Sequence, residues 1–245
     1  MDRHALSIRT KLLLLPATIG GFLGLYGGIG VLTARSGEQL YTLPTPVDAW
    51  VEPYWPAVLL YLFLFPQVIA ALVVIEDVRV VKRALVGFTV LVLSGVPFWV
   101  FYPVTVPRSP VPVEDLWTYG VALTRYIDPP VNCFPSMHVA DAMFAALLIR
   151  RHDRRVGSLL VLSSMGIWWS TMALDQHWFL DGLAGVALAV VFERLAMHGL
   201  PPEAFRKPSW RHHAVWLGLF VVLFLVAAVP WWMGWITAAD LPQRW

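Results

Sequence analysis

Apolar residues fall in long blocks along this chain, each close to the roughly 20 residues that an α-helix needs to cross the hydrocarbon core of a membrane. Strands of a membrane barrel would instead alternate apolar and polar residues with a period of two, and these blocks do not. The pattern therefore predicts an all-α membrane bundle with about seven helical spans. They lie at 11–34, 56–75, 84–104, 136–149, 156–174, 179–197 and 214–236.

The first span and the longest loop need separate interpretation. The span follows basic residues, as in a signal peptide, but its apolar stretch exceeds the usual core of about 7–15 residues and no clear cleavage pattern follows. We therefore expect it to be retained. The loop at 105–135 is rich in proline around a short interfacial helix expected near 114–127. A long loop at a membrane surface is suited to form the wall of a site.

The composition agrees with an integral membrane protein, since 58% of the residues are hydrophobic and 14% are charged. The sequence shows no internal repeat or low-complexity tract, so residues 1–245 are predicted to form a single membrane domain. A net charge of +2 is too small to indicate a nucleic-acid partner. The lone cysteine, Cys133, excludes an internal disulfide and a multi-cysteine metal site.

The basic residues indicate how the chain crosses the membrane. With a cytoplasmic N-terminus, the inner segments hold all but four of the 18 Lys and Arg residues, from Arg3 onward. The exceptions are Arg35, Arg108, Arg125 and Arg244. Because cytoplasmic segments carry an excess of Lys and Arg, this asymmetry predicts the orientation. The loops at 35–55 and 105–135 and the turn at 175–178 then face outward.

The first group of residues with chemical potential is Asn132-Cys-Phe-Pro-Ser-Met-His138, where the long loop meets the fourth span. Pro135 and Ser136 indicate a helix start, because proline suits the first turn and serine can cap it. The free backbone N–H groups of Met137 and His138 would then point outward, and such a helix start favours an anion. A phosphate is a natural ligand there, with His138 beside it.

The second group lies where the fifth span ends and the sixth begins. Ser170-Thr171 is followed by Gln176-His177 and then by Asp181. If the helix starts near His177, a carboxylate four residues later can hold one imidazole nitrogen and leave the other free to attack. A single histidine at a membrane boundary is more often an interfacial polar residue. Two histidines at helix starts on one side, with a carboxylate, indicate a site.

These motifs resemble the type-2 phosphatidic acid phosphatase superfamily, which includes sphingolipid head-group synthases and vanadium haloperoxidases. The family pattern is Lys, six residues, Arg-Pro; then Pro-Ser-Gly-His; then Ser-Arg, five residues, His, three residues, Asp. This chain has Pro-Ser-Met-His at 135–138 and Ser-Thr, five residues, His, three residues, Asp at 170–181. The resemblance covers about 56–197 and implies a six-helix phosphatase-type core, with 214–236 as an extra span.

Three positions depart from the phosphatase pattern. Met137 stands where the phosphatases have glycine, and Thr171 stands where they have arginine. The first motif is reduced to Arg108, since Phe101 occupies the position of its lysine. Losing two cations weakens the phosphate clamp of an ordinary phosphatase. The motif forms are closer to the inositol phosphorylceramide and sphingomyelin synthase branch, which moves a phospho-head-group between lipids.

The resemblance implies a displacement through a phosphohistidine at the extracytoplasmic face. His177 would attack phosphorus, Asp181 would orient and stabilise its imidazolium, and His138 would protonate the leaving oxygen. His138 would then activate water or an acceptor hydroxyl. The implied partners are a lipid phosphate or phospholipid and a lipid hydroxyl acceptor. No metal or other cofactor is required.

Further residues are candidates for substrate binding. Arg108, Ser136 and the helix-start amide of Met137 would bind the non-bridging phosphate oxygens. Asp141, one turn after His138, could orient that histidine, contact a polar head group or hydrogen-bond a neighbouring helix.

Two turn residues and one arginine are weaker candidates. Asp175 and Gln176 could recognise the head group or be ordinary polar residues of a turn. Arg125 could bind phosphate or extend its charge to the membrane interface.

Other functions stay open at this stage. One is a plain lipid phosphate phosphatase, acting on a phosphatidate or a polyprenyl diphosphate. Another is a zinc site built from His138, His177 and Asp181, which are plausible ligands. The third is a non-catalytic lipid-binding or transport protein that uses the same buried side chains.

Overall fold

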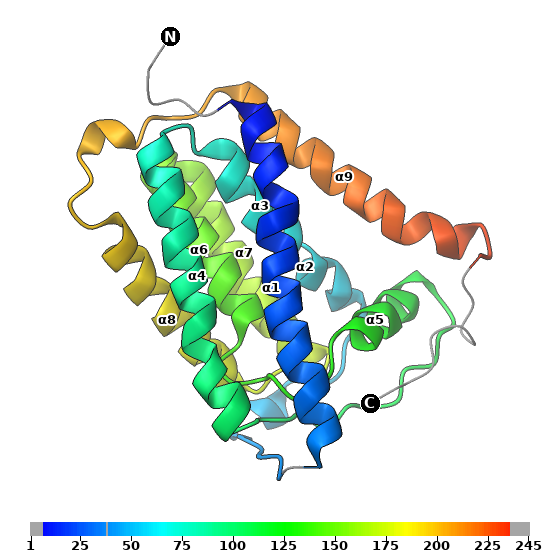
Figure 1. Ribbon diagram of the computed structural model, residues 1–245. Coiled ribbons are helices and arrows are strands. Elements are labelled where there is room, and N and C mark those ends of the chain that lie inside the picture. Colours follow the sequence, from blue (N-terminus) through cyan, green and yellow to red (C-terminus); the bar gives the residue numbers. More distant parts are fainter. Residues whose placement is uncertain (1–6, 38, 236–245) are drawn as a thin grey trace.

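The computed structural model describes residues 7–37 and 39–235, and these form a helical bundle (Figure 1). Within those residues, β-type pairing is limited to an isolated bridge between Tyr41 and Val104. Arg3 and Arg244 lie outside the described residues. The all-α prediction is confirmed. The helices are α1 (Ile8–Ser36), η1 (Asp48–Trp50), η2 (Trp55–Ala57), α2 (Val58–Leu62), α3 (Leu64–Val74), α4 (Val78–Phe101), α5 (Leu116–Ile127), α6 (Met137–His152), α7 (Arg154–Ala173), α8 (Phe179–Met197), η3 (Pro202–Ala204) and α9 (Trp210–Trp232).

Each predicted span coincides with a helical stretch, and the helix expected near 114–127 is α5. Among the described residues, four helical stretches are long and apolar enough to cross a membrane: Trp55–Val74, Val78–Phe101, Arg154–Ala173 and Trp210–Trp232. Helix α6 is not among them because it has only 16 residues. Helix α8 is not among them because it carries three charged residues, Asp181, Glu193 and Arg194, within its 19 residues. The protein is an integral membrane protein.

Helix α6 lies at the centre of the bundle, with its most extensive contacts to α3, α7 and α8. Small residues allow this close packing, because Ala140, Ala142 and Ala146 are fully buried. A polar contact also joins three of these helices. The side-chain amide of Gln67 on α3 donates to the carbonyl of Ala142 on α6 at 2.8 Å and to Ser164 on α7 at 2.7 Å.

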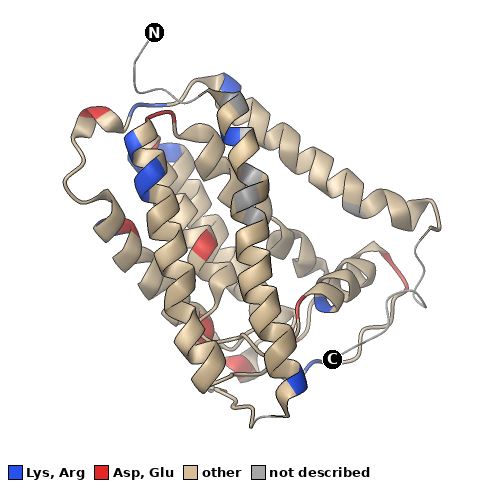
Figure 2. Ribbon diagram, viewed as in Figure 1, with Lys and Arg blue, Asp and Glu red and all other residues tan. Residues whose placement is uncertain are grey.

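The two ends of the bundle differ in charge. Lys and Arg residues gather at the end where α1 and α4 begin and where α6 leads into α7 (Figure 2). Helices α6 and α8 begin at the opposite end, so the two sequence motifs come together there, beside α5 and the long loop.

The start of α6 and the first turns of α8 lie close together because residue 185 is glycine. A Cβ atom at Gly185 would lie 2.5 Å from the carbonyl oxygen of Ser136 and 3.2 Å from the backbone nitrogen of Ala140. Both of these atoms belong to the backbone of α6 or its cap, and they cannot move aside as the end of a flexible side chain can. A side chain at 185 would therefore force α8 away from the helix start that carries His138.

Gly185→Ala is expected to destabilise the protein by about 1–3 kcal/mol, as overpacking does, although alanine is the better helix former. Thermal unfolding in detergent measures this change. Gly218→Ala in α9 is the matched control, because nothing lies within 4 Å of a Cβ atom there. It should be neutral or slightly stabilising. A Gly185→Ala variant as stable as the Gly218→Ala variant would contradict the close approach of α6 and α8.

Candidate active site

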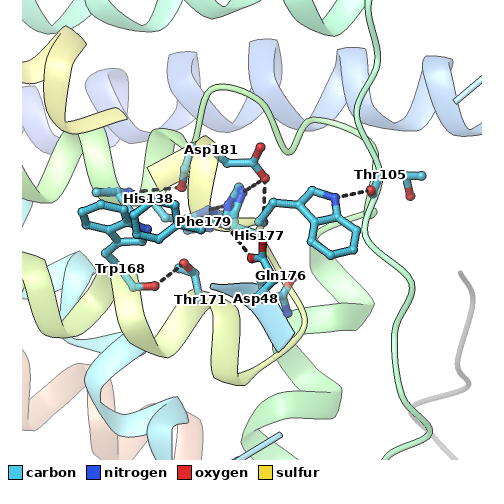
Figure 3. A network of polar contacts seen from close by, with 12 residues as sticks. Asp48, Thr105, His138, Trp168, Thr171, Gln176, His177, Phe179 and Asp181 are labelled. Atoms are coloured by element: carbon cyan, nitrogen blue, oxygen red, sulfur yellow. Dashed lines mark hydrogen bonds and ion pairs between the residues drawn. The ribbon is translucent and has the colours of Figure 1, made fainter. Parts of the chain in front are cut away.

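His138 and His177 face each other at this end of the bundle (Figure 3). His138 is the second residue of α6, and His177 lies in the turn between α7 and α8. Nδ1 of His138 and Nε2 of His177 are 3.0 Å apart. His177 is 3% exposed. The pairing expected from the two motifs is therefore present in the folded chain.

Asp181 holds the far side of the His177 ring, although the two residues do not share one helix. Helix α8 begins at Phe179, and Asp181 folds back so that its Oδ2 accepts from the backbone N–H of Trp178 at 2.8 Å. The same oxygen lies 3.3 Å from Nδ1 of His177. A helix-capping contact thus places the carboxylate against the imidazole.

Ser136 caps α6, as the sequence predicts. Its side chain accepts from the backbone N–H of Val139, and its own N–H donates to the carbonyl of Asp181 at 3.0 Å. The starts of α6 and α8 are therefore tied together by a backbone hydrogen bond. Met137 follows as the first residue of α6, with its side chain buried in the apolar core.

Two residues that the motifs did not indicate contact His138. The hydroxyl of Tyr61, on α2, lies 2.7 Å from Nε2 of His138, and a carboxylate oxygen of Asp128 lies 3.7 Å from the same nitrogen. Tyr61 is 77 residues away and sits in an apolar span. No local spacing could have identified it. Asp128 follows α5 directly, in the proline-rich loop.

The hydrogen bonds are consistent with one set of imidazole tautomers. If Tyr61 donates to Nε2 of His138, the remaining N–H of His138 donates to Nε2 of His177, and Nδ1–H of His177 donates to Asp181. In this arrangement Nε2 of His177 is the unprotonated nitrogen, and its lone pair accepts the hydrogen bond from Nδ1–H of His138. That nitrogen is the one directed toward His138.

Burial keeps the His177 ring neutral. It lowers the pKa of His177 from 6.5 to about 3, a backbone contact with Cys133 opposes this, and the positive charge of Arg108 adds to the lowering. An imidazole is neutral above its pKa, so His177 is uncharged at neutral pH. A neutral imidazole is the nucleophilic form.

Arg108 provides the positive charge of the site. Its Nη2 donates to Oε1 of Gln176 at 2.6 Å, but its Nε and Nη1 are buried and have no partner among the described residues. The side-chain nitrogen of Gln176 is likewise buried and unpartnered. Buried donors are normally paired, so this arrangement leaves three donors for a ligand such as phosphate.

The loop that carries Arg108 is fastened to the α7–α8 turn by Asp175 and Arg125. A carboxylate oxygen of Asp175 accepts from the backbone N–H of Ser109 at 3.0 Å and lies 3.3 Å from Arg125. Arg125 also donates to the carbonyls of Ser109 and Leu174, at 2.5 and 2.8 Å. Both side chains therefore hold the loop in position, a role the sequence did not indicate for either.

Residues outside the two motifs also contact the start of α8. Asp48, the first residue of η1, accepts from the backbone N–H of Phe179 at 2.7 Å, and Trp178 donates from its ring to the carbonyl of Thr105 at 2.9 Å (Figure 3). The side chain of Thr171 donates to its own helix, at the carbonyl of Trp168. It adds no charge where the phosphatase pattern has arginine.

Asp141 is the candidate that lies apart from the histidine pair. It is buried on α6, one turn beyond His138, and lines an apolar cavity between α1, α3, α4 and α6. Within residues 7–37 and 39–235, its Oδ1 has no hydrogen-bond partner.

A possible metal-ligand set differs from the one the sequence indicated. Among the described residues, Cys133, His177 and Asp181 offer ligand atoms within 4.8 Å of one another. Burial raises the pKa of the Cys133 thiol. The thiol is therefore protonated in the metal-free site, and a metal that bound these residues would have to displace that proton.

Comparison with known proteins places these residues in a family. Residues 54–195, more than half of the chain, match the PAP2 superfamily. The chain is also similar to the inositol phosphorylceramide synthase catalytic subunit AUR1 of Saccharomyces cerevisiae, at 34% identity over 71 residues. That match covers 29% of this chain and 18% of the yeast protein. No solved structure shows significant similarity.

Proposed function

The chain belongs to the PAP2 superfamily, and on this basis we propose that it is a membrane enzyme that transfers a phosphorylated head group from a lipid through a phosphohistidine at His177. The observation that supports this most strongly is the contact of His138 with His177 at 3.0 Å, beside the unpaired donors of Arg108. A nucleophile, an acid–base group and an anion-binding side chain therefore meet at one point. The catalytic core is the segment 56–197.

In the first step, Nε2 of His177 attacks phosphorus and the bond to the leaving lipid oxygen breaks. His138, in its imidazolium form for this step, gives one proton to that oxygen and is left neutral, and Asp181 stabilises the positive charge that develops on His177. In the second step, His138 removes a proton from an acceptor hydroxyl, whose oxygen bonds to phosphorus as the bond to His177 breaks. Arg108 and Gln176 bind the non-bridging oxygens in both steps.

The charge of the site favours a phosphodiester over a phosphate monoester. A monoester carries about −1.5 to −2 at neutral pH, whereas a diester carries a single negative charge. Among the described residues, Arg108 has two unpaired donor nitrogens. Arg125 is paired with Asp175 and bonded to the carbonyl of Leu174, which leaves only its Nε unpartnered. Phe101 is 82% exposed and Thr171 is uncharged, so neither replaces a missing cation. A phospholipid head group therefore suits the site better than a phosphatidate.

We also propose that the site faces the extracytoplasmic side. The basic residues gather at the other end of the bundle (Figure 2), and cytoplasmic ends carry the excess of Lys and Arg. Lipid head groups of the outer leaflet would then reach the histidine pair.

Purified protein tests the proposal with a panel of phospholipids and lipid phosphates, each with and without a lipid alcohol as acceptor. A new phosphodiester lipid is the expected product. Inorganic phosphate released from phosphatidate at a higher rate would instead support a plain phosphatase. Absence of any product, with a His177→Ala variant that keeps its cellular role, would contradict an enzymatic function and support lipid binding or transport.

Arg108→Gln is expected to lower kcat/KM by about 10²- to 10³-fold, the usual effect of removing a donor to a developing oxyanion. Arg108→Lys should recover part of the loss, because it restores the charge but not the planar set of donors. Arg35→Gln is the control, since Arg35 is exposed at the same end of the bundle. Equal effects of Arg108→Gln and Arg35→Gln on steady-state kinetics would exclude phosphate binding by Arg108.

Chelation should leave the activity unchanged. The mechanism assigns every proton and charge to side chains, and the Cys133 thiol is a poor ligand in its protonated form. The measurement is the transfer rate after dialysis against a strong chelator. Loss of activity that added zinc restores would point instead to a metal held by Cys133, His177 and Asp181.

A further inference from the structure

A hydrogen-bonded row of four side chains runs through the site. The hydroxyl of Tyr61 lies 2.7 Å from Nε2 of His138. Nδ1 of His138 lies 3.0 Å from Nε2 of His177, whose Nδ1 lies 3.3 Å from Oδ2 of Asp181 (Figure 3). Both nitrogens of both rings are used within this row. A neutral imidazole has one N–H and one acceptor nitrogen, so the position of one proton determines the positions of the others.

Asp181 sets the direction of the row at one end. Its Oδ2 already accepts from the backbone N–H of Trp178 at 2.8 Å, so this oxygen acts as an acceptor toward His177 as well. Neutral His177 then carries its proton on Nδ1 and leaves Nε2 unprotonated. The bond between the rings therefore needs a proton on Nδ1 of His138, and Nε2 of His138 becomes an acceptor.

Tyr61 supplies the donor that this direction requires at the other end. With the opposite tautomer, neutral His138 would carry its proton on Nε2 and turn an unprotonated Nδ1 toward the unprotonated Nε2 of His177. Two acceptor nitrogens would then face each other at 3.0 Å. The hydrogen bond between the rings would be lost, and buried polar atoms without a partner are costly in free energy.

A carboxylate beside Tyr61 favours that opposite tautomer. An oxygen of Asp128 lies 3.7 Å from Nε2 of His138, and the other oxygen of Asp128 is buried with no hydrogen-bond partner in the described part of the chain. An ionised carboxylate only accepts, so it would draw the proton of neutral His138 to Nε2. The hydroxyl of Tyr61 lies closer to this nitrogen, at 2.7 Å, and opposes that shift by donating to it.

Apolar packing holds Tyr61 in position. The residue lies in the last turn of α2 and is buried in a cluster that includes Val58, Val121 and Leu174. Its ring centroid is 5.0 Å from that of His138. The hydroxyl is therefore directed at the imidazole by the fold of the resting protein.

We propose that Tyr61 is a positioning residue, which holds neutral His138 in the Nδ1–H tautomer and thereby keeps Nε2 of His177 unprotonated for attack on phosphorus. No bond to Tyr61 forms or breaks. A hydroxyl both donates and accepts, so Tyr61 can also turn to accept from Nε2–H when His138 becomes an imidazolium. The effect of Tyr61 on the reaction rests on the proposed function, whereas the tautomer is a property of the resting protein.

Nitrogen NMR on protein with isotope-labelled histidine measures the tautomers directly, because protonated and unprotonated ring nitrogens differ in chemical shift. Signals are assigned by their loss in His138→Gln and His177→Gln. At neutral pH without substrate, wild-type His138 should carry its proton on Nδ1, and Nε2 of His177 should be unprotonated. A wild-type His138 with its proton on Nε2 would overturn the inference.

Tyr61→Phe removes the hydroxyl and keeps the ring. In this variant the proton of His138 should move from Nδ1 to Nε2. Tyr119→Phe is the matched control, because Tyr119 is a buried tyrosine of α5 whose ring stacks on Trp231. It should keep the wild-type tautomers. Thermal unfolding of both variants checks that the fold persists.

Kinetics measure the consequence for the reaction. Tyr61→Phe should lower kcat by about 10- to 100-fold with KM within about threefold of the wild type, the scale of one unpaired buried polar group. A lipid analogue with a nitrophenol leaving group should suffer the same loss, since a better leaving group does not restore the lone pair of His177. Tyr119→Phe should react at the wild-type rate.

The two measurements separate this inference from the proposed function. Wild-type kcat in Tyr61→Phe, a lower kcat with unchanged tautomers, or full recovery with the nitrophenol analogue would each overturn the role of Tyr61 while leaving the enzyme function intact. A wild type with no product from any lipid would instead contradict the proposed function. The NMR spectra would still show whether Tyr61 sets the tautomer of His138.

Discussion

His177→Gln is expected to lower kcat for head-group transfer by at least about 10⁴-fold, the upper end of what one acid–base group contributes, because the nucleophile itself is lost. Glutamine keeps a polar side chain of similar length, so the fold should persist. A lipid analogue with a nitrophenol leaving group should not rescue this variant, since a better leaving group cannot replace a missing nucleophile. Steady-state rates on both substrates measure the effect.

His198→Gln is the matched control, because it makes the same substitution at an exposed position beyond the other end of α8. It should retain wild-type activity. A His177→Gln variant with more than about one hundredth of wild-type activity would rule out His177 as the nucleophile, since another group would then be forming the bond to phosphorus.

His138→Gln is expected to lower kcat by about 10²- to 10⁴-fold on a natural lipid, whose alkoxide leaves only with a proton. With the nitrophenol analogue the first step no longer needs that proton, so nitrophenol should be released rapidly. The second step still needs a base, and the release should therefore stop after one equivalent per enzyme. Stopped-flow absorbance measures this burst.

The two histidine variants should therefore differ in the kinetics of nitrophenol release, and not only in their rates. The burst should appear in His138→Gln and be absent from His177→Gln. The reverse result, a burst in His177→Gln, would exchange the roles of the two residues. Continuous turnover of the analogue by His138→Gln would show that the second step does not use His138 as its base.

The helices could be predicted because apolar block length reports directly on membrane-spanning helices. The start of α6 could be placed as well, since a serine that caps a helix leaves a local signal before an apolar run. The break at Phe63, which divides the second predicted span into α2 and α3, has its signal in Pro66, which has no N–H to donate to the carbonyl of Leu62 at the end of α2. The prediction treated the apolar block as one continuous span and did not use this signal.

The histidine pair could be predicted because two helix starts on one side of the membrane must meet at one end of the bundle. The contacts of Tyr61 with His138, and of Asp48 with Phe179, span 77 and 131 residues, so only tertiary packing creates them. Asp175 illustrates the opposite case. Its place beside His177 suggested head-group recognition, yet its carboxylate is occupied by Ser109 and Arg125.

Chemical trapping of the phosphorylated enzyme tests the central proposal most directly. The enzyme would be mixed with a phospholipid labelled in its phosphoryl head group, quenched within milliseconds in base, and mapped by mass spectrometry. The predicted result is the phosphorylated head group bound to the peptide that contains His177, stable in base and lost in acid, and absent from His177→Gln. A label on a different residue, or none during active turnover, would contradict the mechanism.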